Sequence, residues 1–195
     1  MFWADRIAEE LKNSGPQLVD DAKTPSGKVH VGALRGVIIH GLVYRALKEA
    51  GNKARFTYII DNFDPMDGLP VYLDQEKYLE HMGKPLKDIP SPDGHHNSYA
   101  EYYAEDFIQV INKLGVKPEV IWTFDLYKSG RMNDSIKLAL DNHEKIQKIY
   151  KEVSGSAKSK DWYPFSPVCD RCGKIGPPRQ WLGMVKRWSM IAALI

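Results

Sequence analysis

The chain has 195 residues, of which 43% are hydrophobic and 27% are charged, and its formal net charge is +2. This length predicts one domain with room for a small appendage, and the composition is typical of a soluble globular protein. The small net charge excludes nucleic-acid binding driven by overall charge, so any such binding depends on local patches. Because no apolar run is long enough to span a bilayer and Asp5, Glu9 and Glu10 are untypical of a targeting peptide, we expect a cytoplasmic protein with no membrane partner.

The first elements in the chain are a helix, a strand, a second helix and a second strand. Residues 2–13 carry an apolar stripe at helical spacing, and residues 17–21 have strand character. An apolar helical pattern runs from 31 to 49, with Gly51 at the C-cap position, and residues 55–60 follow as a strand. This order predicts a right-handed β-α-β unit and therefore an α/β fold with a parallel sheet.

The loop between the first strand and the second helix is rich in Pro, Ser and Gly. In a Rossmann-like sheet, this is the turn that receives a nucleotide. Gly27 allows a tight turn, and Gly32 removes a side chain where a ligand must approach closely. The N–H groups at the helix start favour an anion, and His30 is placed to donate to a phosphate.

Two carboxylates, Asp61 and Asp64, follow the second strand directly. Ligands of open α/β sheets bind beyond the carboxyl ends of the strands. The pair therefore suits a cationic substrate, through either an α-ammonium or the ε-ammonium of lysine. The alternative is that these side chains cap a helix or form an Asx turn before Pro65.

A segment rich in Pro and Gly, residues 65–97, separates these elements from the next helix, which we expect over residues 98–114. Excursions of this length are usually functional or mobile. His95 and His96 suggest a metal, but sequence neighbours rarely point at one ion. We therefore favour a polar pocket edge over a metal site.

The later elements are a strand over 118–124, a helix over 133–153 and a basic linker that starts at 154. The lysines of this linker could contact RNA phosphates, although a solvated linker is the simpler interpretation. Cys169 and Cys172 form a C-x-x-C that indicates half a zinc site or a redox pair. A structural zinc needs four ligands, and the chain has no second cysteine pair.

Several stretches together resemble the class I lysyl-tRNA synthetases. The run from Pro25 to Arg35 reads P-S-G-x-x-H-V-G-x-x-R and is similar to the HIGH signature of class I aminoacyl-tRNA synthetases, with Ala33 in place of the final histidine. Further matches stand at 2–5, 61–64, 98–101, 126–130 and 169–172, so the resemblance covers residues 2 to about 175.

The resemblance implies a Rossmann-like (HUP-type) domain with flanking helices, an insertion and an incomplete zinc-ribbon knuckle. Its parts would be the first half of the catalytic domain (1–64), the insertion (65–97), the remainder of that half (98–153), and a linker with a partial zinc knuckle (154–176). The implied function is ATP-dependent ligation of L-lysine to tRNA(Lys) through a lysyl-adenylate. Mg²⁺ would accompany ATP, and Zn²⁺ would be structural in the full-length protein.

The resemblance also implies roles for individual residues. His30 and Gly32 would be catalytic, with His30 stabilising the phosphates in the transition state. Ala33 cannot supply the usual adenine-side contact, which predicts weakened ATP binding. The implied ligand sets are Pro25, Ser26, Gly27, His30, Gly32 and Ala33 for ATP, Thr24, Asp61, Asp64, His96 and Ser98 for lysine, and Cys169 and Cys172 for a partial zinc site.

Beyond Gly176 the resemblance ends, and the second family signature, K-M-S-K-S, is absent. Our hypothesis is that a frameshift near residue 177 gives residues 177–195 a non-native sequence. We therefore expect the chain to be inactive alone. The alternatives are another HIGH-type synthetase, a nucleotidyltransferase, or a non-catalytic nucleotide-binding fragment.

Overall fold

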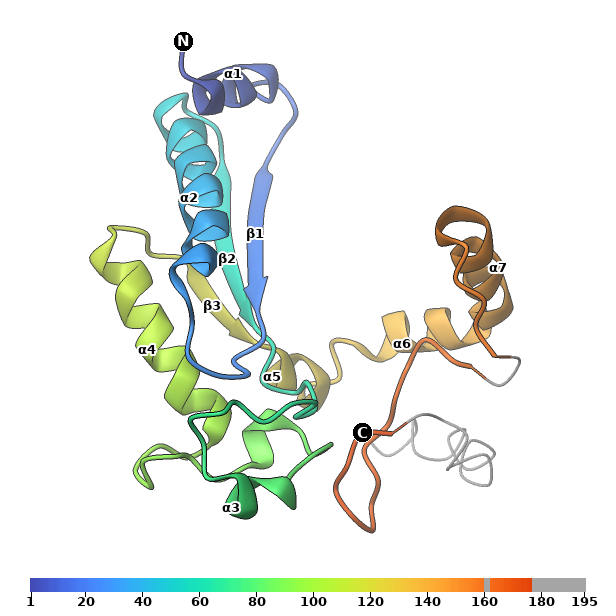
Figure 1. The fold of residues 1–195 in the computed structure, drawn as a ribbon. Helices are drawn as coiled ribbons and strands as arrows, with labels where there is room; N and C mark the ends of the chain where they lie inside the picture. The colour runs from blue at the N-terminus through green and yellow to red at the C-terminus, as the bar shows by residue number, and fades with distance from the viewer. Residues whose placement is uncertain (160–161, 177–195) are drawn as a thin grey trace. The chain divides into compact units, whose positions relative to one another are not determined.

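The computed structural model describes residues 1–159 and 162–176, so the predicted non-native tail lies outside the described residues (Figure 1). Contacts divide the chain into two units. Unit 1 comprises Met1–Asp64, Pro70–Asp74 and Leu86–Thr123. Unit 2 comprises Pro65–Leu69, Gln75–Pro85 and the described residues from Phe124 onward.

Unit 1 contains a three-stranded sheet in the order β1-β2-β3, formed by β1 (Gln17–Lys23), β2 (Ala54–Ile60) and β3 (Glu119–Trp122). Both strand pairs are parallel, which confirms the predicted α/β class. In the register, Ile60 lies opposite both Lys23 and Trp122. The three strands therefore end at one level, and the turns that follow β1 and β2 start side by side (Figure 1).

Helices α1 (Trp3–Glu10), α2 (Leu34–Glu49) and α4 (Tyr99–Lys113) build the core against this sheet, and a short 3₁₀ turn, η1 (Val31–Ala33), leads into α2. Strand β2 supplies alternate buried side chains at Phe56, Tyr58 and Ile60, as the period of two in a strand requires. Phe56 packs with α1 and α2, whereas Tyr58 and Ile60 pack with α2 and α4. This packing confirms the predicted helices near 2–13, 31–49 and 98–114 to within a turn.

Two of the expected elements differ from the structure. The third strand ends at Trp122, where α5 (Thr123–Lys128) begins. The single helix expected over 133–153 is wrong, because α6 (Asn133–Asp141) and α7 (His143–Ser154) are separate helices. At the break, the Asn142 side chain donates to the Leu138 carbonyl at 2.9 Å. Asparagine favours such local bonds over a continued helix, which explains the interruption.

Unit 2 holds α3 (Gln75–Leu79), α6, α7 and the cysteine-bearing turn. The remaining short element, η2 (Leu86–Asp88), belongs to unit 1. Within unit 2, Gly83 joins two segments, since its N–H donates to Met66 and its carbonyl accepts from the N–H of Ile175, both at 2.7 Å. Every helix within residues 1–159 and 162–176 is too short or too polar to cross a membrane.

Candidate functional site at the carboxyl edge of the sheet

The motif loop, defined here as Thr24–His30, leaves the carboxyl end of β1 and is held by tyrosines. The Tyr99 hydroxyl donates to the Ser26 carbonyl at 2.8 Å, and the Lys28 N–H donates to the Tyr72 hydroxyl at 2.6 Å. Pro25 is fully buried, whereas Ser26 is exposed. The loop is therefore held by two tyrosine hydroxyls, one buried (Tyr99) and one half exposed (Tyr72).

His30 lies at the end of the motif loop, directly before η1, and is exposed. A Cβ atom added at Gly32 would lie 2.9 Å from both Nδ1 and Cε1 of the His30 ring. The glycine thus allows the imidazole to lie over the start of the helix. Ala33 follows and packs against the core cluster around Val37.

Three predicted lysine ligands gather where the strands end. The Thr24 hydroxyl donates to Asp64 at 3.2 Å, and the backbone N–H of Asp61 donates to the Lys23 carbonyl at 3.0 Å. Both Asp61 and Asp64 are half-buried. Thr24, Asp61 and Asp64 therefore form one acidic corner, named here the strand-end cluster.

Thr123 adjoins the strand-end cluster, and the sequence did not point to it. Its hydroxyl donates to Asp61 at 2.8 Å and accepts from the Phe63 N–H at 3.3 Å. The sequence places Thr123 within the expected strand 118–124, where nothing distinguishes it from its neighbours. In the structure β3 ends at Trp122, so Thr123 lies outside the strand, at the start of α5.

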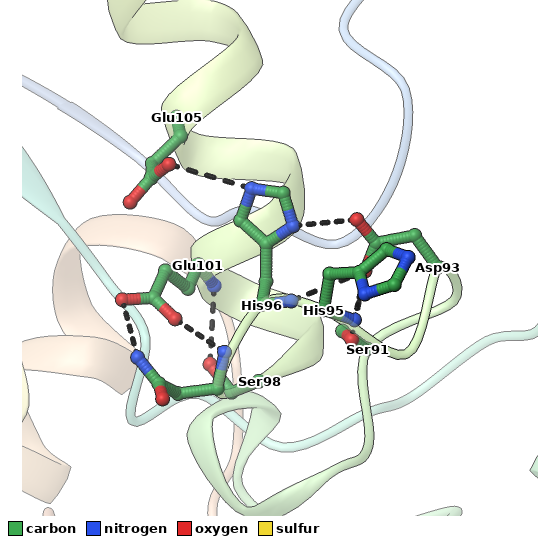
Figure 2. Close-up of polar contacts among 8 residues, drawn as sticks. Ser91, Asp93, His95, His96, Ser98, Glu101 and Glu105 are labelled. Atoms are coloured by element: carbon green, nitrogen blue, oxygen red, sulfur yellow. Dashed lines mark hydrogen bonds and ion pairs between the residues drawn. The ribbon is translucent and has the colours of Figure 1, made fainter.

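His96 lies between two carboxylates (Figure 2). Its Nδ1 is 2.7 Å from Asp93, and its Nε2 is 3.4 Å from Glu105. The hydrogen bond to Asp93 raises the pKa of His96, while partial burial opposes that shift. The Asp93 carboxylate also accepts from the backbone N–H groups of His95 and His96 and from the Ser91 hydroxyl. These donors, the His95 N–H foremost, hold the pKa of Asp93 far below its ordinary value.

Ser98 has a structural task at the start of α4. It is the N-cap residue, and its buried hydroxyl accepts from the Glu101 N–H at 3.1 Å. The Glu101 side chain in turn accepts from the Asn97 N–H at 2.6 Å (Figure 2). The Ser98 hydroxyl thus satisfies one of the first N–H groups of the helix, and the Glu101 carboxylate holds the residue before the N-cap. A contact between Ser98 and lysine remains a prediction.

A pocket of about 420 Å³ brings His96 next to the motif loop. Its lining includes neither Thr24 nor the two aspartates of the strand-end cluster, so the predicted lysine ligands fall into two groups. The pocket combines a lysine, two carboxylates, a histidine and tyrosines, and its lining residues are Lys28, Val29, His96, Tyr102, Tyr103, Glu105, Asp106 and Gln109.

The cysteine pair lies on a tight turn in unit 2. Cys169 is buried, and its sulfur accepts the N–H groups of Arg171 and Cys172, both at 3.3 Å. Burial raises the pKa of the Cys169 thiol, but hydrogen bonds from Cys172 and Arg171 outweigh it and lower the pKa. Among residues 1–159 and 162–176, no group of three or more His, Cys, Asp or Glu side chains is placed to hold a metal. The zinc ribbon is therefore not seen, and two thiols are half of the ligand set that a structural zinc needs.

Comparison with known proteins identifies the family. The family model described as tRNA synthetases class I (K) matches residues 1–178. The chain belongs to the class I tRNA synthetases (K). Among curated relatives, the lysine–tRNA ligase of Methanosarcina barkeri (strain Fusaro / DSM 804) is 45% identical over 176 residues, which is 90% of this chain and 33% of the relative.

The lysine–tRNA ligase of Thermoplasma acidophilum is 37% identical over 175 residues, covering 90% of this chain and 34% of the relative. That of Methanocaldococcus jannaschii is 35% identical over 178 residues, covering 90% of this chain and 33% of the relative. This class I synthetase chain thus spans about a third of the length of the curated relatives that it matches.

Proposed function

We propose that this chain is the amino-terminal part of a class I lysine–tRNA ligase. Such an enzyme forms lysyl-adenylate from ATP and L-lysine and then transfers lysine to tRNA(Lys). The names of the relatives support the substrate, and one observation on this chain carries the proposal. The motif loop and the aspartates of the strand-end cluster lie at the same carboxyl edge of a parallel sheet, where α/β folds bind nucleotides and small substrates.

The first step is an in-line attack of the lysine carboxylate on the α-phosphate of ATP. The protein supplies positioning and electrostatic stabilisation for this step rather than covalent chemistry. His30 and the backbone of Pro25–Gly27 are assigned to the phosphates, with Gly32 leaving room for the His30 ring. Ala33 packs into the core and presents only a methyl group, so the adenine-side contact is weaker here than with histidine.

Asp61 and Asp64 are assigned to an ammonium group of lysine, with Thr24 as a neighbour that orients Asp64 through its 3.2 Å hydrogen bond. A half-buried carboxylate pair gives charge-assisted hydrogen bonds to a cation. His96 lies in the adjacent pocket and is assigned a secondary role, because its ring nitrogens are already against Asp93 and Glu105. Mg²⁺ enters with ATP, bound through phosphate oxygens and water.

A second candidate follows from the length of the chain relative to its relatives. The chain spans about a third of each, so a fragment that binds nucleotide without completing the ligation is the second proposal. The two candidates differ in one measurable respect, because only the ligase fragment needs a selective lysine site beside the nucleotide.

The experiment is equilibrium dialysis of the chain with labelled lysine, in the presence of ATP and Mg²⁺. We expect Asp61→Asn to weaken lysine binding by roughly ten- to a hundred-fold, the effect of losing one hydrogen bond between charged groups. Asp106→Asn is the matched control, because Asp106 is exposed on the pocket wall and lies outside the strand-end cluster.

Arginine and ornithine are the competitors in the same dialysis. If ATP binds but lysine does not, or if arginine competes equally, the nucleotide-binding fragment or another synthetase replaces the lysine assignment. If Asp61→Asn leaves lysine binding unchanged, the strand-end cluster is not the amino-acid site.

A further inference from the structure

A short segment from the insertion lies on the motif loop. The chain leaves unit 1 after Asp64, returns to it for the five residues Pro70–Asp74, and leaves again before its return at Leu86. Within Pro70–Asp74, named here the strap, the Leu73 N–H donates to the Pro70 carbonyl at 3.0 Å and closes a tight turn. Val71 at the turn is 95% exposed, and Tyr72 is 46% exposed. The turn therefore presents Tyr72 to the loop while most of the strap remains in solvent.

The Tyr72 hydroxyl occupies the outer surface of the motif loop. It accepts the Lys28 N–H at 2.6 Å, and it lies 2.5 Å from the position of a Cβ atom added at Gly27. The Lys28 ammonium lies 4.9 Å from the centre of the same ring. Tyr72 thus covers the Gly27 backbone and both the backbone N–H and the side chain of Lys28, the only lysine of the motif loop.

These three groups are the ones that a phosphate uses in a glycine-containing loop. Backbone N–H groups donate to phosphate oxygens, glycine permits their close approach, and a lysine adds a positive charge. A hydroxyl oxygen that accepts from such an N–H stands where a phosphate oxygen would stand. The contact between Tyr72 and Lys28 therefore competes with an anionic ligand.

We propose that the strap is a built-in competitor of the nucleotide: the Tyr72 hydroxyl occupies the phosphate position at Lys28, and ATP binds after Tyr72 leaves. This inference rests on the proposed function, because it takes the ligand of the motif loop to be ATP. A ligand that binds only the open form has its affinity reduced by the fraction of molecules that are open. Removing the competing hydroxyl raises that fraction.

Tyr99 provides the matched comparison. It also bonds the motif loop through its hydroxyl, but it is fully buried and donates to the Ser26 carbonyl. A carbonyl oxygen does not bind phosphate, so the Tyr99 contact supports the loop and competes with nothing. The substitutions Tyr72→Phe and Tyr99→Phe therefore each remove one hydroxyl that bonds the motif loop, but only Tyr72→Phe is expected to strengthen ATP binding.

The experiment measures ATP·Mg²⁺ binding by calorimetry in the chain and in both variants. We expect Tyr72→Phe to bind ATP about three- to ten-fold more tightly, since the hydrogen bond from the Lys28 N–H in the closed form is lost, along with the bond between Tyr72 and Tyr103. Tyr99→Phe should bind ATP equally or more weakly. Hydrogen exchange gives an independent readout: the Lys28 amide should exchange faster in Tyr72→Phe than in the unmodified chain without any ligand.

The outcomes separate the two proposals. If ATP binds the unmodified chain and Tyr72→Phe binds it equally or more weakly, the strap is a support of the loop and the inference is overturned. If neither protein binds ATP, the nucleotide site itself is wrong, and the proposed function falls together with the inference. Because Tyr72 is half exposed and the substitution keeps its ring, loss of folding is not expected.

Discussion

At the scale of single residues, His96 and Asp93 make the fold sensitive to pH. The Asp93 hydrogen bond raises the pKa of His96 above 6.5, with smaller contributions from the Glu105 and Glu101 charges. Protonated His96 therefore stabilises the fold fully below pH 6.5, and this contribution is lost as the pH rises through the higher folded-state pKa. The Asp93 contribution has the opposite sign: it is present above pH 3.8 and is lost as the pH falls through the lower folded-state pKa. Between pH 3.8 and pH 6.5, the His96 and Asp93 contributions to stability are both present.

We predict that His96→Gln lowers the melting temperature most between about pH 5 and pH 6, and progressively less as the pH rises above 6.5. Thermal unfolding followed by circular dichroism across this range gives the difference from the unmodified chain. His95→Gln is the control, because the His95 side chain is exposed and its bond to Asp93 comes from the backbone N–H, which glutamine keeps. A difference that stays constant with pH would mean that His96 acts only by packing against the Tyr102 ring, 5.3 Å away.

The sequence predicted some of these residues and could not predict others. His30 and Gly32 stand out because a motif of fixed spacing precedes a helix, and the structure places the His30 ring over Gly32. Tyr72 gave no signal, since a tyrosine in a Pro- and Gly-rich segment is usually a packing residue, and Tyr99 stood in the matched stretch 98–101 without an assigned role. Their contacts join positions 44 and 73 residues apart, which only the tertiary fold determines.

At the scale of elements, the ends of β2 and β3 are joined by the Thr123 hydroxyl. It bonds Asp61 and the Phe63 N–H at once, so it orders the turn that carries both predicted lysine ligands after β2. We predict that Thr123→Val lowers the free energy of unfolding by about 1–2 kcal/mol, because a half-buried N–H and a carboxylate each lose a partner. Urea denaturation measures this loss.

Thr123→Ser separates the hydroxyl from the methyl group. Serine keeps both hydrogen bonds, so it should recover most of the lost stability and any lysine binding lost in Thr123→Val. Equal destabilisation by valine and serine would assign the effect to packing of the methyl group instead.

Periodicity located the elements well and their ends less well. The parallel pairing of β1 and β2 follows from the β-α-β order and its usual handedness, and the register bears this out. The helix expected over 133–153 satisfied the same periodicity but breaks at Asn142, where the side chains of Asn142 and His143 bond the carbonyls of Leu138 and Leu140. An apolar pattern can continue in phase across a break, so periodicity alone does not reveal it.

At the scale of the whole molecule, the two units divide the chain at points that no local pattern marks. The insertion over 65–97 stays a prediction, and the contacts assign the strap and Leu86–Thr123 to unit 1. Composition cannot show this, because the flanking segments share the same Pro and Gly content. The two faces of β1 also differ in exposure: Val19 faces the core, whereas Leu18 on the opposite face is 64% exposed.

The reading frame near residue 177 bears on how this chain relates to its longer relatives. The family model matches residues 1–178, and the chain covers a third of its relatives. Back-translated from Arg179 and read two bases later, one permitted choice of codons gives Ala-Val-Ala-Trp-Asp-Gly-Lys-Glu-Val-Glu-Tyr-Asp-Cys. This alternative reading ends in a cysteine, the residue type that Cys169 and Cys172 need to extend half a zinc ligand set.

We propose that a frameshift separates this chain from a longer product, and sequencing the gene across codons 170–200 and downstream tests it. The expected result is a second frame that carries a further cysteine pair and later K-M-S-K-S. The protein read through that frame should bind one zinc per chain, because four thiolates complete a tetrahedral site, and substitution of Cys172 by serine should reduce its zinc content. A second frame closed by stop codons would exclude the frameshift and leave the nucleotide-binding fragment as the better description of this chain.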